Sequence, residues 1–570
     1  MERCVDGVIN LIAKAQRPDG YLNSHYIVSD LKARWTNLRD AHELYCAGHL
    51  TEGAVAYFQA TGKRKFLDVM CRYVDHIATV FGTRPGQKRG YCGHEEIELA
   101  LVKLYRATNE PRYLDLAKYF IDERGRQPNY FDMEAKARGE KPRDFRINAR
   151  GSVSREFYFN YEYNQSHRPV REQDTVVGHS VRAMYLYCGM ADVAAATNDK
   201  TLLAACRRLW NSLVHQQMHI TGGLGPVHAN EGFTCDYDLP NEGAYLETCA
   251  AIGLVFWAHR MVNAELDSQY TDVMERALYN GTISGVAHDG RTFFYGNPLA
   301  VQPSFNGNGQ FVARGYHYRR SEWFNTSCCP TNIVRMLAQF PSFLYSTGPD
   351  QLAVHHYAES EAQLTVAGQT IRLTQTTGYP WAEKIVVTIQ PEHTAKWTLA
   401  LRIPAWCRGA KLQVNGQSVA VARITLKGYA RLKRKWHKGD RVTLVLPMPV
   451  ERIEAHPAVR QDCGRVALHR GPVVYCLEEA DNGGNLNDFV LRSDAAFTIQ
   501  RSRTGLFNGI PRILAKACRR NSGDWQGELY RPQVSRQVPC VITAIPYFMW
   551  ANRAPGEMLV WIRAAATDKE

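Results

Sequence analysis

The chain has 570 residues, of which 45% are apolar, and this is enough for about two to four domains with sizeable cores. No run of about 18 apolar residues occurs, which excludes a membrane-spanning helix. The formal net charge is +13, but the basic residues are scattered, and the densest run, 431–438, is interrupted by Leu432 and Trp436 as in a solvated strand. We therefore expect neither a membrane nor a nucleic acid as partner, while an acidic substrate stays open.

Two features favour a cytoplasmic protein. The N-terminus lacks the apolar segment of a secretory signal. The 15 cysteines are odd in number and include no Cys-x-x-Cys pair, which is typical of reduced thiols. The first residues already have the pattern of the middle of an amphipathic helix, so we expect an upstream segment to be missing.

The first 345 residues are predicted to be mainly helical. Apolar residues recur at three- and four-residue spacing in five segments, namely 52–58, 97–105, 113–120, 180–187 and 246–257. A Gly-His pair, ending at His49, His94 and His179, is predicted to open a helix in three related segments, with spacings of 45 and 85 residues. Repeats of this size indicate an array of helix pairs. Because polar helix starts recur at related positions, we predict a closed α/α toroid.

After residue 345, short alternating segments separated by turns dominate. Segments 364–368 and 411–416 carry hairpin signals, the second with an Asn-Gly turn. We predict a β-sandwich over 346–449. Further strands at 466–468, 473–477 and 558–562 predict a second sandwich over 450–570. The predicted domains are therefore 1–345, 346–449 and 450–570.

Two short cysteine-containing segments are the most informative part of the chain. Pro330 suits the first turn of a helix, so Cys328 and Cys329 would lie at a helix N-terminus, where thiolates are favoured. Glu247 and Cys249 would point apart on a regular helix and could share a partner only at an irregular helix start. Three thiols and one carboxylate are enough for a four-coordinate zinc site. Buried structural cysteines remain the alternative.

Other candidates have a more ordinary explanation when taken singly. Glu231 lies in a Gly-rich loop that lacks the spacing of a phosphate-binding loop. His42, His94 and His179 each fall near a predicted helix start and suggest a polar ring around one mouth of the toroid. Tyr295 lies in an aromatic segment. An exposed glutamate, capping histidines and a core tyrosine would account for the same pattern.

Taken together, these segments resemble glycoside hydrolase family 127, whose known members include β-L-arabinofuranosidases. The resemblance covers nearly the whole chain, and its matching segments are 42–49, 93–98, 178–182, 247–249 and 327–332. It implies an (α/α)6 barrel followed by β-sandwich domains, a glycoside substrate and a homodimer. The family members begin earlier in the barrel, so the first helices of the ring are expected to be missing here.

The resemblance also implies the site. A zinc ion would be bound by Glu247, Cys249, Cys328 and Cys329. Cys328 would be the nucleophile and Glu231 the general acid/base of a retaining glycosidase. The sugar would be contacted by a further set of side chains, His42, His94, His179 and Tyr295.

Three other functions remain open on the sequence. The same mechanism can act on another cell-wall sugar, such as an acidic pectin-derived residue. A carbohydrate-binding protein can use zinc only to hold its fold together, since structural zinc sites also have four protein ligands. A sugar epimerase on a similar helical ring would rely on histidines and would leave the paired cysteines without a role.

Overall fold

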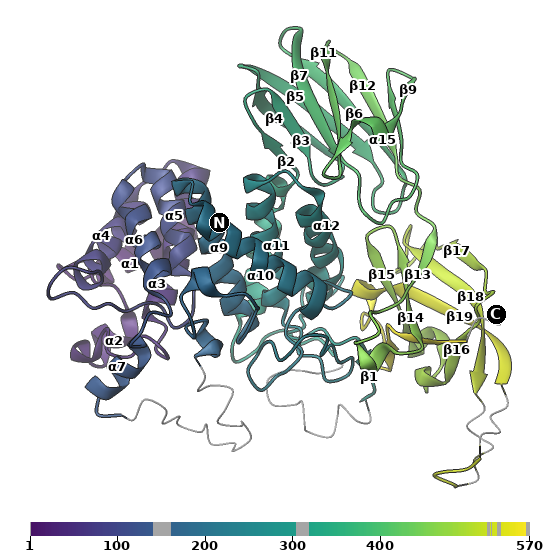
Figure 1. Ribbon diagram of the computed structural model, residues 1–570, viewed down its shortest axis with the longest axis horizontal. Coiled ribbons are helices and arrows are strands. Elements are labelled where there is room, and N and C mark those ends of the chain that lie inside the picture. Colours follow the sequence, from purple (N-terminus) through teal and green to yellow (C-terminus); the bar gives the residue numbers. More distant parts are fainter. Residues whose placement is uncertain are drawn as a thin grey trace. The chain divides into compact units, whose positions relative to one another are not determined.

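The computed structural model describes residues 2–140, 161–303, 319–520, 525, 527–532 and 537–565. The chain forms two compact units, Met1–Gln217 with Val227–Thr234, and Met218–Pro226 with Cys235–Glu570. The first unit is helical, and the second contains further helices and the β-strands (Figure 1). The change from helices to strands near residue 345 therefore lies inside the second unit. Among the described residues, every helix is too short or too polar to span a bilayer.

The first unit is built from helix pairs. Its helices are α1 (Glu2–Ala15), α2 (Ser24–Val28), α3 (Glu43–Thr61), α4 (Lys65–Val80), α5 (Ile97–Thr108), α6 (Pro111–Glu123), α7 (Tyr130–Ala137), α9 (Ser180–Thr197) and α10 (Lys200–Ser212). Helix α5 packs against α3, α6 and α9 (Figure 1). Four of the five segments with helical periodicity fall inside these helices, and the fifth overlaps α11 (Thr248–Ala264) of the second unit.

Small residues allow the central helices to approach closely. A Cβ added to Gly48 of α3 would lie 2.8 Å from Glu96 Cγ, and one added to Gly189 of α9 would lie 2.8 Å from Glu98 Cβ. The sequence placed Gly48 and His49 at a helix start, which is wrong, because both lie inside α3. A glycine is needed at position 48 because α3 contacts the start of α5 there, and not because the chain turns.

The three candidate histidines lie at or next to helix starts. His42 is the N-cap of α3 and His179 is the N-cap of α9. His94 precedes the N-cap of α5, which is Glu96. His42 has a left-handed backbone, with φ of 56°, which is uncommon for a residue other than glycine and is frequent at functional sites.

In the described part of the second unit, the α-helices that precede the sandwich are α11 (Thr248–Ala264), α12 (Ser268–Arg276) and α14 (Cys328–Gln339). A two-sheet sandwich follows. One sheet has the order β10-β11-β7-β3-β2 and the other β4-β5-β6-β12-β8-β9. The strands are β2 (Tyr345–Thr347), β3 (Gln351–Val354), β4 (Ser360–Val366), β5 (Gln369–Thr377), β6 (Lys384–Pro391), β7 (Ala395–Arg402), β8 (Lys411–Val414), β9 (Gln417–Val419), β10 (Thr425–Leu426), β11 (Tyr429–Trp436) and β12 (Asp440–Val445).

Both sheets of the sandwich contribute to one core. Leu399 and Leu432 come from one sheet, and Val387 and Leu444 from the other. The predicted turn between β8 and β9 is present, with φ of 50° at Asn415 and 82° at Gly416, as an Asn-Gly hairpin turn requires.

The strands after residue 449 belong, together with β1, to one ten-stranded sheet in the described part of the chain. They are β1 (Ala300–Val301), β13 (Val450–Ile453), β14 (Arg465–Arg470), β15 (Val473–Glu478), β16 (Phe489–Leu491), β17 (Phe497–Arg501), β18 (Pro511–Arg520), β19 (Gln537–Pro546), β20 (Met558–Leu559) and β21 (Ile562–Ala564). Because β14 pairs with both β15 and β21, the strands β15-β19-β18-β16-β21-β14 close on themselves as a small barrel.

A buried ion-pair network joins α12 to the sandwich. The Arg402 side chain is fully buried, and its guanidinium donates to Asp272 Oδ1 at 2.7 Å and to Glu275 Oε1 at 2.5 Å. Trp406 Nε1 donates to Glu275 Oε2 at 3.1 Å, and Tyr379 Oη donates to Glu275 Oε1 at 2.5 Å. The charges are thus hydrogen-bonded as well as paired, which a buried ion pair requires.

Replacing Arg402 by Met should destabilise the protein by about 3–5 kcal/mol, because the buried charge of Glu275 and the partly buried charge of Asp272 would lose the cation that pairs with them. Arg372→Met is the matched control, since Arg372 pairs with Glu361 at the exposed surface and should contribute less than about 1 kcal/mol. Urea unfolding of both variants measures the difference. Equal losses in the two variants would contradict the role given to Arg402.

Candidate active site

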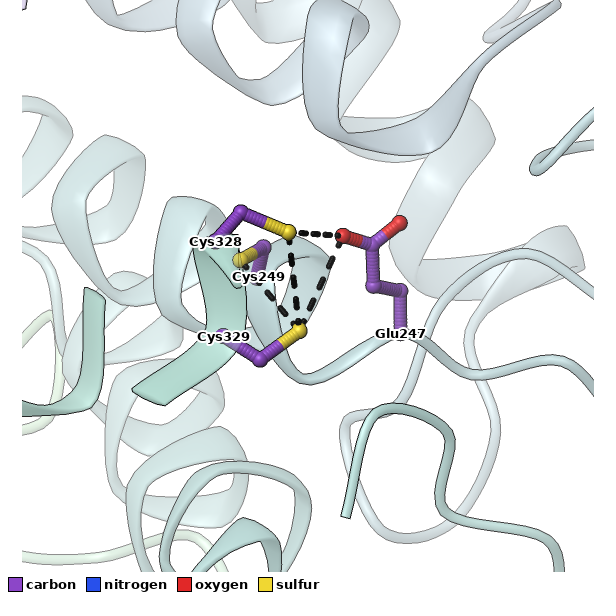
Figure 2. A group of neighbouring side chains, drawn as sticks. All are labelled: Glu247, Cys249, Cys328 and Cys329. Carbon is purple, nitrogen blue, oxygen red and sulfur yellow. Dashed lines mark hydrogen bonds between the residues drawn. The ribbon is translucent and has the colours of Figure 1, made fainter. Parts of the chain in front are cut away.

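Three cysteines and one glutamate of the second unit meet at the N-termini of two helices. Glu247 is the N-cap of α11 and has an extended backbone, with φ of −58° and ψ of 133°, while Cys249 lies in the first turn. Cys328 and Cys329 open α14. Since Glu247 lies outside the helix, its side chain and that of Cys249 face the same point, as the irregular helix start anticipated. Figure 2 shows the four side chains directed toward one another.

The distances within this cluster are close to those around a tetrahedral metal. Cys249 Sγ lies 3.5 Å from Cys329 Sγ, and Cys328 Sγ lies 3.8 Å from Cys329 Sγ. Glu247 Oε1 lies 3.5 Å from Cys328 Sγ and 3.9 Å from Cys329 Sγ. With zinc–ligand distances near 2.1–2.3 Å, a tetrahedron has S···S edges of about 3.8 Å and S···O edges of about 3.6 Å. The donor set therefore fits a metal ion.

The surroundings shift the pKa values of the three thiols in different directions. Hydrogen bonds from Cys249 and Cys329, and one from the Tyr295 hydroxyl at 3.3 Å, hold the pKa of Cys328 well below its ordinary value. Burial raises the pKa of Cys249 and Cys329 well above it. The positive ends of α11 and α14 add to the stabilisation of negative charge at this point. Cys328 is the partly exposed thiol of the cluster, so it combines thiolate character with access.

Tyr295 reaches the cluster because its segment is hydrogen-bonded to the start of α11. Thr248 N donates to Tyr295 O at 2.8 Å, and Thr248 Oγ1 donates to Phe294 O at 2.9 Å. Asn297 Nδ2 donates to Leu246 O at 3.2 Å. These bonds fix the segment on both sides of the tyrosine.

Tyr245 was not found by sequence reasoning. Its hydroxyl donates to Glu247 Oε2 at 2.7 Å, and both side chains are buried. Glu247 thus presents Oε1 to the sulfur atoms while Oε2 accepts from Tyr245. Such partners orient a metal ligand and contribute to metal affinity. The available signal was weak, namely a tyrosine two residues before the candidate ligand.

The remaining candidates lie together in the first unit. The ring centres of His42 and His94 are 5.7 Å apart, and those of His94 and His179 are 5.5 Å apart. His179 Nε2 lies 3.0 Å from Glu231 Oε2. The nine residues named from the sequence therefore form two groups, with these four in the first unit and Tyr295 and the four metal-ligand candidates in the second.

Backbone hydrogen bonds select the tautomer of each histidine. Nδ1 of His179 accepts the N–H groups of Val181 and Arg182 at 3.2 and 3.5 Å, so Nε2 carries the proton and donates to Glu231. Nδ1 of His42 donates to a backbone carbonyl at 2.8 Å and Nδ1 of His94 to another at 3.2 Å. His42 and His94 are left with Nε2 as an acceptor.

Burial and the charge of Arg182 keep two of these rings neutral. Burial is the main cause that lowers the pKa of His94 well below its ordinary value, and Arg182 lowers it further. The same two causes, in the same order, lower the pKa of His42. Arg182 is held by a bond to Gly93 O at 2.5 Å and by stacking over Tyr163 at 4.4 Å. Arg182 ends the segment 178–182 that carries the resemblance, but its role could not be predicted from the sequence.

Glu231 is fixed through its backbone. Its φ of 52° is left-handed, and its carbonyl accepts Ser180 N at 3.1 Å and Ser180 Oγ at 3.0 Å. The loop is thereby tied to the start of α9, beside His179. A carboxyl group held at 3.0 Å from a histidine ring nitrogen has the arrangement of a positioned acid or base.

Comparison with known proteins identifies related enzymes. The family model described as the β-L-arabinofuranosidase GH127 catalytic domain matches residues 1–342, the GH127 middle domain matches 351–448, and the glycoside hydrolase family 127 C-terminal domain matches 450–563. A non-reducing end β-L-arabinofuranosidase of Bifidobacterium longum subsp. longum is 35% identical, over 98% of this chain and 84% of its own length.

Two solved structures are similar over the whole chain. One is a GH127 β-L-arabinofuranosidase from Geobacillus stearothermophilus T6, with 49% identity and a TM-score of 0.94, covering 99% of this chain and 87% of that one. Another GH127 β-arabinofuranosidase has 38% identity and a TM-score of 0.85, covering 99% and 84%.

Tyr245→Phe should lower the affinity for zinc about 10- to 100-fold, because Glu247 loses the hydrogen bond that orients it. Competition with a chromogenic chelator measures this affinity without substrate. Tyr475→Phe is the control, since the Tyr475 hydroxyl is buried and has no hydrogen-bond partner in the described part of the chain. An unchanged affinity in Tyr245→Phe would contradict the orienting role.

Proposed function

The chain belongs to glycoside hydrolase family 127, and from that premise we propose that this glycoside hydrolase is a retaining enzyme that releases L-arabinofuranose from β-L-arabinofuranosides. The observation that carries the proposal is the cluster of three sulfurs and one carboxylate oxygen at 3.5–3.9 Å. Enzymes named for this activity are similar to the chain over nearly its full length. The helices are proposed to belong to an (α/α)6 barrel.

We assign the metal site to zinc. Glu247, Cys249, Cys328 and Cys329 would hold it, since a mainly thiolate set with one carboxylate suits zinc. Zinc, when bound, stabilises the thiolates and makes the sulfur of a glycosylated cysteine a better leaving group. The N-termini of α11 and α14 act in the same direction.

Glycosylation is the first step of the proposed reaction. The Cys328 thiolate attacks the anomeric carbon, a C–S bond forms, and the glycosidic C–O bond breaks. Glu231 gives its proton to the departing oxygen. The His179 N–H bonded to Glu231 Oε2 at 3.0 Å then stabilises the carboxylate that remains.

Deglycosylation reverses the roles. The Glu231 carboxylate removes a proton from water, the water oxygen attacks the anomeric carbon, and the C–S electron pair returns to Cys328. Two displacements at one carbon give retention of configuration. His42 and His94 would accept hydrogen bonds from sugar hydroxyls through Nε2, and Tyr295 would contact the sugar beside Cys328.

The function is tested by hydrolysis of p-nitrophenyl β-L-arabinofuranoside, with zinc measured on every sample. Cys328→Ala should lose at least about a thousandfold in kcat/KM, because it removes the nucleophile. Glu231→Gln should lose at least about a thousandfold in kcat, because deglycosylation loses its base while the activated leaving group needs little acid. Glu231→Gln should keep its zinc. Cys206→Ala, which removes a buried thiol of the first unit, should retain activity.

The outcomes separate the alternatives. Activity that survives Cys328→Ala would overturn the cysteine mechanism and favour histidine chemistry. A zinc-containing parent without activity on this glycoside would point to another sugar or to a structural zinc site. Loss of zinc from Glu231→Gln would mean that this variant reports on the fold and not on catalysis.

A further inference from the structure

A cavity of about 660 Å³ lies on the C-terminal barrel. Its lining includes Arg465 of β14, Arg563 of β21, Val490 of β16 and Arg520 of β18. These four strands are neighbours in the sheet, in the order β18-β16-β21-β14. The volume is within the range of small-molecule sites in proteins, about 300–1,000 Å³.

The strand registers place the three arginines on one face. Arg465 is directly opposite Arg563, and Arg563 is opposite Val490. Val490 is opposite Cys518, and Arg520 follows Cys518 by two residues, so it lies on the same face. The residues that alternate with them, such as Val466 and Ile562, belong to the core inside the barrel. Because side chains alternate along a strand, the arginines lie on the outer face of the barrel, where the cavity opens.

The positive charges at this cavity act on one another. Like charges directly opposite in an antiparallel pair are unfavourable, as for Arg465 and Arg563. Burial lowers the pKa of Arg563, and the charges of Arg520 and Arg465 lower it further. Asp488 acts in the opposite direction, but less than either arginine.

The three arginines have no carboxylate within 4.0 Å in the described part of the chain. Arg465 donates to neutral groups, the Trp561 carbonyl at 2.9 Å and Asn487 Oδ1 at 3.3 Å. Some other arginines of the same domain are paired with carboxylates, as Arg492 is with Asp494 at 2.8 Å and Arg553 is with Asp481 at 2.6 Å. Among the described residues, the cavity is therefore a local excess of positive charge.

We propose that this cavity binds a ligand that bears an oxyanion, a carboxylate or a phosphate, through Arg563, Arg520 and Arg465. A guanidinium offers paired donors that match such a group, and a dianion or carboxylate would offset the unfavourable row of charges. Such an oxyanion can come from two sources, a uronic acid of a glycan or free phosphate. This site is separate from the proposed catalytic residues and does not depend on the sugar that they cleave.

Isothermal titration of the full-length protein at constant ionic strength tests the proposal, with trigalacturonate, inorganic phosphate and neutral maltotriose as probes. At least one anion should bind the parent, while maltotriose should not. Arg563→Gln and Arg520→Gln should each raise that Kd at least about tenfold, because a charge-assisted hydrogen bond is lost. Arg503→Gln removes an equal charge from an exposed site in the same domain and should leave the Kd within about twofold.

The probes also identify the source. Binding of trigalacturonate without phosphate supports a glycan carboxylate, and binding of phosphate alone supports a free phosphate. No binding of either anion at millimolar concentration overturns the proposal, as does equal weakening in Arg503→Gln, which would indicate only diffuse charge. Thermal unfolding without anions is a second measurement, since Arg563→Gln should not lower the Tm when a repulsive charge is removed.

Discussion

Three sulfur atoms and one carboxylate oxygen must meet at one point, and the proposed catalytic centre depends on this constraint. The sulfurs of Cys249 and Cys329 belong to segments separated by 80 residues, and α11 packs against α14 so that both helices start at the cluster. Such a concentration of negative charge is unfavourable unless it is offset. Two helix N-termini, the Tyr245 and Tyr295 hydroxyls and a bound cation can offset it together.

Much of the fold could be predicted from local pattern. The periodic segments became helices, the Asn-Gly pair became a hairpin turn, and histidines marked the starts of α3, α5 and α9. The closure of the C-terminal strands into a barrel could not be predicted, because it depends on pairings such as β16 with β21 that are distant in sequence. Gly48 was misplaced for the same reason, since its role is a contact between two helices.

The candidate site likewise contains residues that a local sequence pattern predicts and others whose roles depend on contacts in the folded chain. Cys328 and Cys329 were found because a proline follows them at a helix start, and Glu247 because it stands two residues before a cysteine. The part played by Tyr245 arises from one hydrogen bond in the folded chain, and a tyrosine in that position has no distinctive sequence pattern. Histidine tautomers are likewise set by backbone partners that only the fold supplies.

Acid quenching of Glu231→Gln during turnover of p-nitrophenyl β-L-arabinofuranoside, followed by peptide mass spectrometry, tests the central claim most directly. This activated leaving group needs little help from an acid, whereas deglycosylation still needs the base, so a covalent intermediate should accumulate. The account predicts one pentosyl adduct located on Cys328. An adduct on another residue, or turnover with no adduct and inversion of configuration, would contradict it.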